Sequence, residues 1–348
     1  MTDAYVSQIY PDDNLANAKL ERLLKQEGIR KDANLDYTCG LFDEDDDLIA
    51  TGSCYKNTLR CLAVSGAHQG EGLLNTIVTH LIQVQAERGN MHLFLYTKCG
   101  AAKYFKELGF YEIIRIEGEI VFMENRKNGF ADYLAKLEAE SPKCANAGAI
   151  VMNANPFTLG HLFLVRTAAG QCGTLHLFMV SEDASLFPFA VRKRLIMENT
   201  KGIENIVYHE SGDYIISSAT FPSYFQKDEE AVVRSHASLD IAVFTRIAKA
   251  LGITKRFVGD EPFSTTTSIY NRIMQAELEK KEIECVVVRR KEEDDKPISA
   301  SQVRLAIKQD DWETCRKLVP EATYAYLSSA EGRPVVEAIK ASEDVVHH

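Results

Sequence analysis

The chain has 348 residues, 45% hydrophobic and 26% charged, a composition that excludes a disordered or fibrous protein. Its formal net charge of −10 disfavours a nucleic-acid partner, because neutralising phosphates requires an excess of lysine and arginine. No apolar run approaches the ~20 residues that a membrane helix needs, so we expect no membrane partner either. At about 100–200 residues per domain, the length predicts two domains.

The cysteines predict a reducing compartment. No two of the eight form a CxxC pair, and the first ten residues, MTDAYVSQIY, lack the basic and apolar regions of a signal peptide. We therefore expect reduced thiols, most of them buried, in a cytoplasmic protein. The cysteines are Cys39, Cys54, Cys61, Cys99, Cys144, Cys172, Cys285 and Cys315.

Three strand patterns open the first domain, at Tyr37–Phe42, Leu48–Tyr55 and Leu59–Val64. A run of acidic residues, Asp43 to Asp47, separates the first two strands. Such a run is compatible with a metal site, but between two strands it is more typical of a solvated hairpin turn, and we predict the turn.

The rest of this domain mixes helices and strands. Gln69-Gly-Glu-Gly72 follows the third strand and precedes apolar residues at helical spacing. With the earlier strands, these elements predict a mixed, mostly antiparallel α/β domain over residues 1–130. The further elements are a strand at His92–Tyr96, a helix at Ala101–Leu108, and strands at Phe110–Ile116 and Glu119–Glu124.

A polar linker helix is expected within residues 131–147, and strands and helices alternate after it. Alternation predicts a parallel sheet in a second α/β domain, residues 148–348, with ligands bound beyond the carboxyl ends of its strands. We expect strands at Ala149–Ala154, Leu175–Val180, Asn205–Tyr208, Arg256–Gly259 and Glu284–Arg289, and helices at His161–Ala169, Pro188–Thr200, Glu229–Leu251 and Thr267–Lys281.

The first candidate site is the turn between the strand ending at Ala154 and the helix beginning near Gly160. The first amides of a helix are unpaired and its dipole is positive there, which favours phosphate. Gly160 allows close approach of the backbone, and His161 adds a donor that can follow charge developing on a phosphate. The nucleotide-binding candidates are Asn153, Asn155, Pro156, Phe157 and Gly160, and the catalytic candidates are Thr158 and His161.

The second candidate site is Ile298-Ser-Ala-Ser-Gln-Val-Arg304, which also begins a helix. Ser299 and Gln302 form a capping-box pattern, which alone would indicate only a helix start. Paired with the first site in one α/β domain, however, two helix N-termini can hold a triphosphate from two sides. Ser299 and Ser301 are then nucleotide-binding candidates, and the forked donors of Arg304 match phosphate oxygens.

Other candidate site residues allow either a functional or a purely structural interpretation. Arg192, Lys193 and Arg194 could reach phosphates or form a solvated basic face. Gly259 and Asp260 end a strand and could contact the base or ribose of a nucleotide, or form a buried turn. The charged loop Arg289–Lys296 is expected to be mobile, and we expect Mg²⁺ to arrive with ATP, held by phosphate oxygens.

Both motifs together resemble the HxGH nucleotidyltransferase superfamily. The matching residues are Thr158, Gly160 and His161, followed by Ile298, Ser299, Ser301 and Arg304. The resemblance implies a Rossmann-like domain that attacks the α-phosphate of ATP and releases pyrophosphate, with His161, Thr158 and Arg304 in catalytic roles. Thr158 replaces the first histidine of the strict motif, as in the pantetheine-phosphate branch of that superfamily.

The first domain resembles the GNAT acetyltransferases through Gln69-Gly-Glu-Gly-Leu73 and Tyr104-Phe-Lys-Glu-Leu-Gly-Phe110. The resemblance implies that Gln69, Gly70, Gly72 and Leu73 hold the diphosphate of a pantetheine-bearing, CoA-like group. Leu74 replaces the small residue that ends the family's motif. Phe105 replaces the tyrosine that donates a proton in many members, which favours binding over acetyl transfer.

The order of all these motifs resembles the citrate lyase ligases. That resemblance implies that ATP and acetate form acetyl adenylate, and that the acetyl group passes to the thiol of the CoA-like prosthetic group on the citrate lyase acyl carrier subunit. Two alternatives stay open. One is a pantetheine-phosphate or mononucleotide adenylyltransferase, and the other is a non-catalytic regulator that senses nucleotides.

Overall fold

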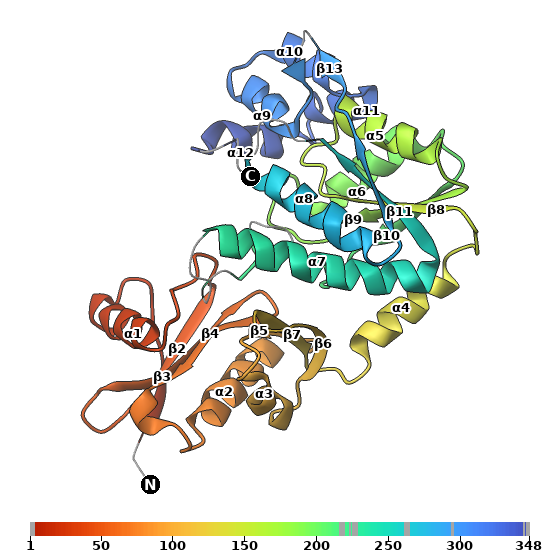
Figure 1. Cartoon of the computed structure of the whole chain (residues 1–348). Helices are drawn as coiled ribbons and strands as arrows, with labels where there is room; N and C mark the ends of the chain where they lie inside the picture. The colour runs from red at the N-terminus through yellow and green to blue at the C-terminus, as the bar shows by residue number, and fades with distance from the viewer. Residues whose placement is uncertain are drawn as a thin grey trace. The chain divides into compact units, whose positions relative to one another are not determined.

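The structure is a computed structural model that describes residues 4–215, 220–222, 224, 229–260, 265–293, 296–343 and 345. The chain forms two compact units (Figure 1). One runs to Asp132 and includes Pro222–Ser235, and the other comprises Tyr133–Phe221 and the chain from His236 onward. The boundaries expected from sequence did not anticipate that Pro222–Ser235 belongs with the first unit.

The first unit is built on a seven-stranded sheet of order β1-β2-β3-β4-β5-β7-β6. Neighbouring strands are antiparallel except β4 and β5, as the mixed α/β prediction requires. The elements are β1 Tyr5–Gln8, α1 Asn14–Gln26, β2 Tyr37–Phe42, β3 Leu48–Tyr55, β4 Thr58–Val64, a short 3₁₀ helix Gly66–His68, α2 Leu73–Glu87, β5 Phe94–Thr97, α3 Ala102–Glu107, β6 Tyr111–Ile116 and β7 Ile120–Glu124.

Helix α1 and strand β1 were not among the predicted elements. The local signals of α1 are nevertheless present, because Asp13 caps the helix by accepting from the Ala16 amide at 2.9 Å. Leu20, Leu23 and Leu24 are buried at helical spacing. They pack in one apolar cluster with Phe42 and Leu48 of the sheet, so α1 supplies part of the core of this unit.

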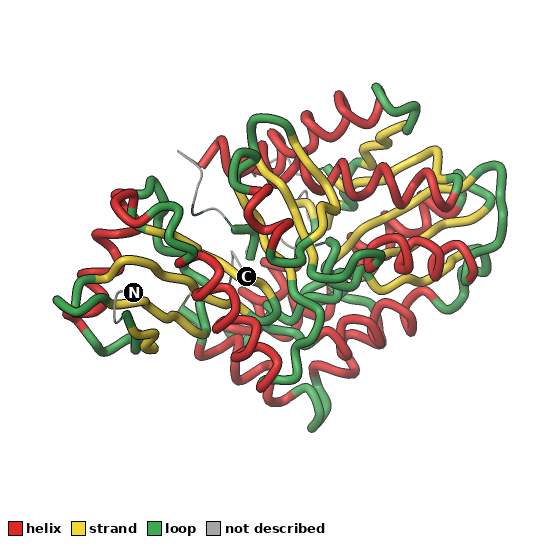
Figure 2. Tube along the Cα trace, turned by 90° about the horizontal axis from the view of Figure 1, so that it is seen from below, coloured by secondary structure: helices red, strands yellow, loops and turns green. Residues whose placement is uncertain are grey.

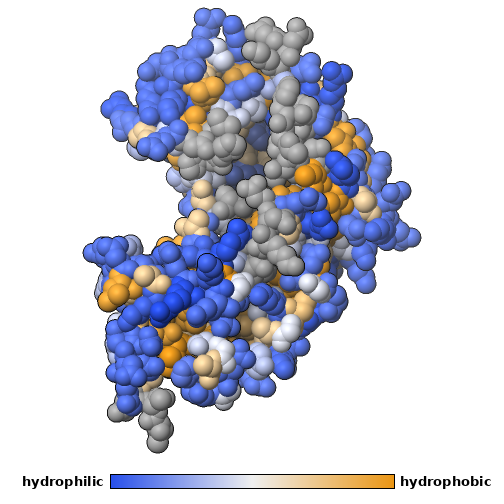
Figure 3. All heavy atoms as spheres, turned by 60° about the vertical axis from the view of Figure 1, so that its left-hand side comes forward, coloured by the Kyte–Doolittle hydropathy of each residue, from blue (hydrophilic) through white to orange (hydrophobic). Residues whose placement is uncertain are grey.

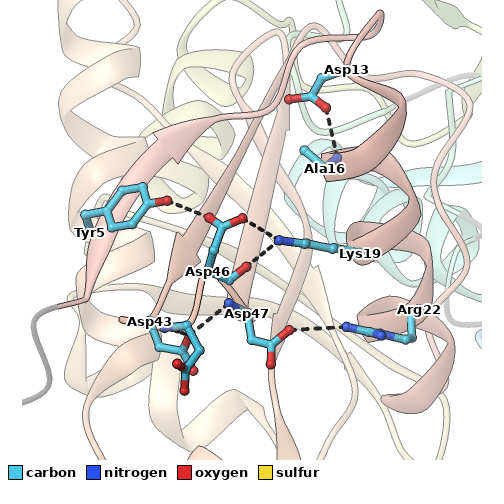
Figure 4. Close-up of polar contacts among 9 residues, drawn as sticks. Tyr5, Asp13, Ala16, Lys19, Arg22, Asp43, Asp46 and Asp47 are labelled. Carbon is cyan, nitrogen blue, oxygen red and sulfur yellow. Dashed lines mark hydrogen bonds and ion pairs between the residues drawn. The ribbon is translucent and has the colours of Figure 1, made fainter.

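The acidic run Asp43–Asp47 forms the β2–β3 turn, as predicted, and its carboxylates bond to protein donors (Figure 4). Asp46 accepts from the Tyr5 hydroxyl at 2.7 Å and from Lys19 Nζ at 2.6 Å. Asp43 accepts from the Asp47 amide at 2.8 Å, and Arg22 lies 3.6 Å from Asp47. The turn is therefore a hairpin tied to α1. Within the part of the chain that the structure describes, no three His, Cys, Asp or Glu side chains gather as metal ligands.

The second unit is built on a parallel sheet of order β10-β9-β8-β11-β12, as predicted. Figure 2 shows helices flanking the strands. Its elements are β8 Ala147–Met152, α5 Leu159–Ala169, β9 Thr174–Met179, α6 Phe189–Thr200, β10 Ile206–Glu210, β11 Ile253–Gly259, α8 Thr265–Glu279, β12 Glu284–Val288, β13 Glu292–Glu293, β14 Lys296–Pro297, α9 Ala300–Lys308, α10 Trp312–Leu318, α11 Glu321–Leu327 and α12 Arg333–Ala341. Two further helices, α4 Gly129–Ala139 and α7 Glu229–Leu251, have residues in both units.

The strand order places a topological switch at β8. The chain proceeds from β8 to β9 and β10 on one side, and later adds β11 and β12 on the other. The connections that follow β8 and β11 therefore leave the sheet in opposite directions, and in open α/β sheets the crevice that binds ligands lies at the carboxyl ends of such strands. Both the turn after β8 and the Gly259–Asp260 strand end lie at this edge.

Hydrophilic residues cover most of the face drawn in Figure 3, with small apolar patches among them. The apolar side chains that are exposed come from several separate elements, including Tyr10, Leu15, Met91 and Phe163. Scattered exposure of this kind is normal for a folded domain. Among the helices that the structure describes, none has the length and apolar character needed to cross a membrane.

A buried histidine pair joins β9 and β10, and it predicts loss of stability in acid. His176 and His209 are 0% and 3% exposed, and their rings are bonded through Nδ1 and Nε2 at 2.9 Å. Burial lowers the pKa of each to about 4, so in the folded protein both stay neutral down to that pH. The unfolded chain takes up these protons from about pH 6.5 downward, so stability present above pH 6.5 is lost as pH falls toward 4.

We expect the free energy of unfolding, measured in urea, to fall between pH 7 and pH 5 by roughly 3–4 kcal/mol for the two histidines together, since one pKa unit corresponds to about 1.4 kcal/mol. The His176→Leu, His209→Phe double variant should lose most of this slope. An unchanged slope in the double variant would show that other groups control the acid transition.

Candidate functional site

The turn after β8 is a buried, cross-linked loop. Asn155 is 4% exposed and its Oδ1 accepts from the Phe187 amide at 3.1 Å, while Asn153 Nδ2 donates to Ser185 Oγ at 2.9 Å. Both bonds tie the loop that follows β8 to the loop that follows β9. Pro156 is buried, and its peptide bond with Asn155 is cis. These predicted nucleotide-binding residues thus lie in an ordered turn at the carboxyl end of β8, and their contact with a nucleotide stays a prediction.

Thr158 and His161 form the capping box that begins α5. The His161 amide donates to Thr158 Oγ1 at 3.3 Å, and the Thr158 amide donates to His161 Nδ1 at 3.1 Å. Because Nδ1 accepts a backbone N–H, the proton of the neutral ring resides on Nε2. The sequence predicted this helix start correctly, and the structure adds the tautomer: His161 offers an Nε2–H donor.

His161 is kept neutral by its surroundings. The ring is half-buried and stacks on buried Phe157, with ring centroids 5.6 Å apart. Burial, assisted by the positive charge of Arg290, lowers the pKa of His161 to about 4. At neutral pH the side chain is therefore a hydrogen-bond donor without a charge of its own, and it becomes more basic when an anion binds beside it.

The second motif also begins a helix as predicted. Ser299 Oγ accepts from the Gln302 amide at 3.2 Å, and Gln302 Oε1 accepts from the Ser299 amide at 3.1 Å, which completes the capping box of α9. Ser299 and Ser301 share a hydroxyl–hydroxyl bond of 2.9 Å. Both hydroxyls thus lie at the positive end of the α9 dipole.

The two motifs meet at Gly160. A Cβ added there would lie 2.9 Å from the Ile298 carbonyl oxygen, so the first turn of α5 and the residue before the α9 cap are in direct contact. Only glycine permits this approach without displacing backbone. The two predicted helix starts therefore lie in contact, and their joint binding of a triphosphate stays a prediction.

This contact predicts the effect of Gly160→Ala. The added methyl must move α5 from the Ile298 carbonyl, so we expect turnover of ATP to fall about tenfold or more, with about 1–3 kcal/mol lost from the free energy of unfolding. Gly170→Ala, at the other end of α5, is the matched control, because its Cβ would lie 3.5 Å from the nearest neighbour, the Arg166 carbonyl oxygen, which is an ordinary contact distance. Equal turnover in both variants and the parent would contradict the tight junction.

The sequence predicted that the forked donors of Arg304 would point at phosphate oxygens, but in the structure this side chain is buried and bonded to the protein itself. It is 3% exposed, its Nη1 donates to the Asn155 carbonyl, and its Nε donates to the Val345 carbonyl at 2.7 Å. The guanidinium thus links α9 to the turn after β8 and to the C-terminal segment. Its contribution to phosphate binding stays a prediction.

Gly259 and Asp260 lie at the carboxyl end of β11, as predicted. The Asp260 amide donates to the Val288 carbonyl at 2.9 Å, and Asn271 Nδ2 donates to the Gly259 carbonyl at 3.3 Å. Both residues are half-buried at the carboxyl edge of the sheet. Residues 261–263, which follow Asp260, lie outside the described residues.

Arg192 neither faces phosphate nor forms a solvated basic surface. It is 0% exposed, and its guanidinium donates to four backbone carbonyls at 2.6–3.0 Å, which rigidifies the loops beyond β8 and β9. Lys193 and Arg194 pair with Glu210 and Glu331. Sequence spacing could not distinguish these roles, because nothing in a basic triplet shows which member is buried.

Arg290 is a residue of this site that the sequence did not single out. Its segment was expected to be a mobile loop, whereas β13 and β14 pair as a short hairpin beyond it. Arg290 Nη1 donates to the Ile298 carbonyl at 3.3 Å, and its charge acts on His161 and Asp260. The only sequence signal was the charge itself.

The first unit contains a cavity of about 670 Å³ where β4 and β5 diverge. These strands pair only at Thr58–Phe94 and Leu59–Leu95, so beyond this point the two strand edges are open to a ligand. The predicted residues Gln69, Gly70, Gly72 and Leu73 all line the cavity. Gly70 and Gly72 have φ of 90° and 77°, which suits glycine, and they lead into the N-terminus of α2.

Tyr224, which is distant in sequence from the rest of this unit, supplies part of the lining of the cavity. Tyr224, 5% exposed, donates to the Tyr96 carbonyl at 3.3 Å, and its own carbonyl accepts from the Arg30 amide at 2.6 Å. Phe105 is buried in the lining, while the neighbouring Tyr104 is 50% exposed.

A family model and the curated relatives of this chain indicate the same protein family. The family model described as the citrate lyase ligase C-terminal domain matches residues 147–327. The curated citrate (pro-3S)-lyase ligase of Escherichia coli K12 is 37% identical over 332 residues and 93% of each chain. That of Klebsiella pneumoniae is 39% identical over 313 residues, 88% of this chain and 91% of its own.

Solved structures resemble the first unit weakly. A GNAT-family acetyltransferase from Staphylococcus aureus Mu50 is 12% identical, with a TM-score of 0.30, and covers 35% of this chain and 99% of its own. A TM-score of this size supports no conclusion about the chain.

Proposed function

Because the chain belongs to the citrate lyase ligase family, we propose that it activates acetate with ATP and acetylates the prosthetic-group thiol of the citrate lyase acyl carrier subunit. The chain is thus an enzyme of the ligase class. The observation that supports the chemistry best is the junction at Gly160, where two capped helix N-termini and His161 meet at the crevice.

The reaction has two steps. In the first, an acetate oxygen attacks the α-phosphorus of ATP, and the bond between this phosphorus and the oxygen that bridges to the β-phosphate breaks. The products are acetyl adenylate and pyrophosphate. In the second, the sulfur of the carrier thiol attacks the acetyl carbon, its proton is lost to solvent, and AMP leaves. Adenylylation turns a poor acyl donor into one with a good leaving group.

The proposed roles follow the two helix starts. The Nε2–H of His161 and the first amides of α5 bind the α-phosphate oxygens, where negative charge grows in the transition state. The hydroxyls of Ser299 and Ser301 and the first amides of α9 hold the departing pyrophosphate. Thr158 fixes the His161 tautomer, Arg304 holds the loop at Asn155, and Gly259 and Asp260 contact the nucleoside.

Mg²⁺ is proposed to accompany ATP. No cluster of three candidate ligand side chains occurs among the residues described, so phosphate oxygens and water would supply most of the ligands. The metal would neutralise phosphate charge, while His161 and the helix amides orient the α-phosphate.

The cavity of the first unit is proposed to bind the CoA-like arm. Its diphosphate would lie on the Gln69–Leu73 turn and the α2 N-terminus, and the pantetheine chain would follow the open edges of β4 and β5. With Phe105 in place of a hydroxyl donor, this unit binds the arm without acetylating amines.

All eight cysteines are free thiols, which supports a cytoplasmic location.

The test is mass spectrometry of the thiol-form carrier subunit after incubation with the chain, ATP and acetate. We expect acetylation that needs both ATP and acetate and that restores citrate lyase activity. A dinucleotide product made from phosphopantetheine or a mononucleotide would favour the adenylyltransferase instead. ATP binding with no product of either kind would favour the nucleotide-sensing regulator.

A further inference from the structure

Arg290 occupies a defined position beside the two helix starts. It follows β12 and precedes the β13–β14 hairpin. Its Nη1 donates to the Ile298 carbonyl at 3.3 Å, and the Ile298 amide donates to the Lys291 carbonyl at 2.9 Å. Both polar groups of Ile298 are therefore bonded to consecutive residues of this segment. Arg290 is held against the residue that precedes the α9 cap.

The Ile298 carbonyl is the point where three elements of the site converge. Gly160 in the first turn of α5 contacts it, Arg290 donates to it, and Ser299, the next residue, caps α9. Arg290 thus lies on the α9 side of the junction. In the proposed reaction, the departing pyrophosphate is held on this same side, at the start of α9.

The junction has a positive electrostatic character. Two helix N-termini each contribute a partial positive charge, and the Arg290 guanidinium lies beside the residue that precedes α9. The Arg290 charge opposes protonation of His161, and the Asp260 carboxylate acts on Arg290 with the opposite sign. Arg290 is half-buried, so solvent screens it only partly. Such a concentration of donors and positive potential suits a polyphosphate.

We propose that Arg290 binds the β- and γ-phosphates of ATP and retains the pyrophosphate after adenylyl transfer. The proposal rests on the proposed function and extends it to a residue outside both motifs. Arginine suits this position because its planar fork carries several N–H donors, so the side chain can keep its bond to Ile298 and also donate to phosphate oxygens. The junction residues then select a triphosphate over AMP.

The test compares Arg290→Gln with Arg289→Gln in the full-length chain. Arg289 is the matched control, because its side chain is 85% exposed and pairs with Glu292 on the surface. Dissociation constants for ATP, pyrophosphate and AMP are measured by calorimetry, together with kcat and KM for ATP. We expect Arg290→Gln to weaken ATP and pyrophosphate binding about ten- to a hundredfold, with AMP binding unchanged and kcat reduced less than kcat/KM.

Two further readouts separate phosphate binding from a structural role. Arg290→Lys, which keeps the charge, should recover part of the pyrophosphate affinity. In NMR titrations of the free protein, His161 should titrate at a higher pH in Arg290→Gln than in the parent, because a neighbouring positive charge has been removed.

Equal weakening of all three ligands, or no weakening of any, would overturn the proposal. Failure of the proposed function is distinguishable, because the parent protein itself would then release no pyrophosphate from ATP in the presence of acetate. The calorimetric comparison of pyrophosphate with AMP needs no turnover, so it tests Arg290 in either case.

Discussion

His161→Ala is expected to lower kcat for pyrophosphate release by about a hundred- to a thousandfold, the usual loss when one donor to a developing oxyanion is removed. The Nε2–H of His161 is aimed at charge that grows only in the transition state, so the dissociation constant for ATP should change by no more than about threefold. Stopped-flow pyrophosphate release and calorimetric ATP binding measure the two quantities. The geometry behind this is the 3.1 Å bond from the Thr158 amide to Nδ1, which fixes the donor tautomer.

Three controls define the His161 result. His161→Gln keeps a neutral donor and should retain more activity than His161→Ala. Thr158→Ser keeps the hydroxyl that caps α5 and should remain close to the parent. Because burial lowers the pKa of His161 to about 4, its protonation should cause no loss of kcat/KM between pH 8 and about 5. ATP affinity that falls in parallel with kcat in His161→Ala would contradict the assignment.

Asp240→Ala is expected to cost about 3–5 kcal/mol in the free energy of unfolding, the typical loss when one partner of a buried ion pair is removed. Asp240 on α7 lies 2.8 Å from Arg256 on β11, and their side chains are only 6% and 5% exposed. Tyr270 on α8 donates to the same carboxylate at 2.6 Å. Burial would raise the pKa of Asp240, but the Arg256 charge and the Tyr270 bond hold it below its usual value.

The loss of stability is expected to be large because Asp240→Ala removes the ion-pair partner of the buried Arg256. Within the described part of the chain, no acceptor reaches its Nε or Nη1, and its guanidinium stacks over the Phe244 ring at 4.4 Å. Without Asp240 the charge is buried and uncompensated. The Asp240→Leu, Arg256→Met double variant should recover most of the stability, as urea unfolding can show. A loss below about 1 kcal/mol in Asp240→Ala would mean that water reaches the guanidinium.

The local parts of the site were accessible from sequence. Ser299 and Gln302 were predicted as a capping box and form one, and the strand end and turn before Gly160 predicted where α5 begins; the Thr158–His161 capping box was found only in the structure. The alternation of strands and helices gave the parallel sheet for the same reason, since period and turn residues are local properties. The element bounds differ from the prediction by only a few residues in most cases.

The non-local parts were not accessible. A guanidinium can bind phosphate, a carboxylate or main-chain carbonyls, and only the fold decides between these. Arg192 and Arg304 donate to carbonyls of distant loops, whereas Arg290 donates to the Ile298 carbonyl beside the start of α9. The inclusion of Pro222–Ser235 in the first unit likewise depends on contacts such as Tyr224 with Tyr96, more than a hundred residues apart in sequence.

ATP–pyrophosphate exchange tests most directly whether this protein adenylylates acetate at the site around Gly160. Labelled pyrophosphate should enter ATP in the presence of acetate without any carrier subunit, and the rate should collapse in His161→Ala. Exchange that ignores acetate and requires phosphopantetheine, or carrier acetylation that proceeds with no acetate-dependent exchange, would contradict the claim.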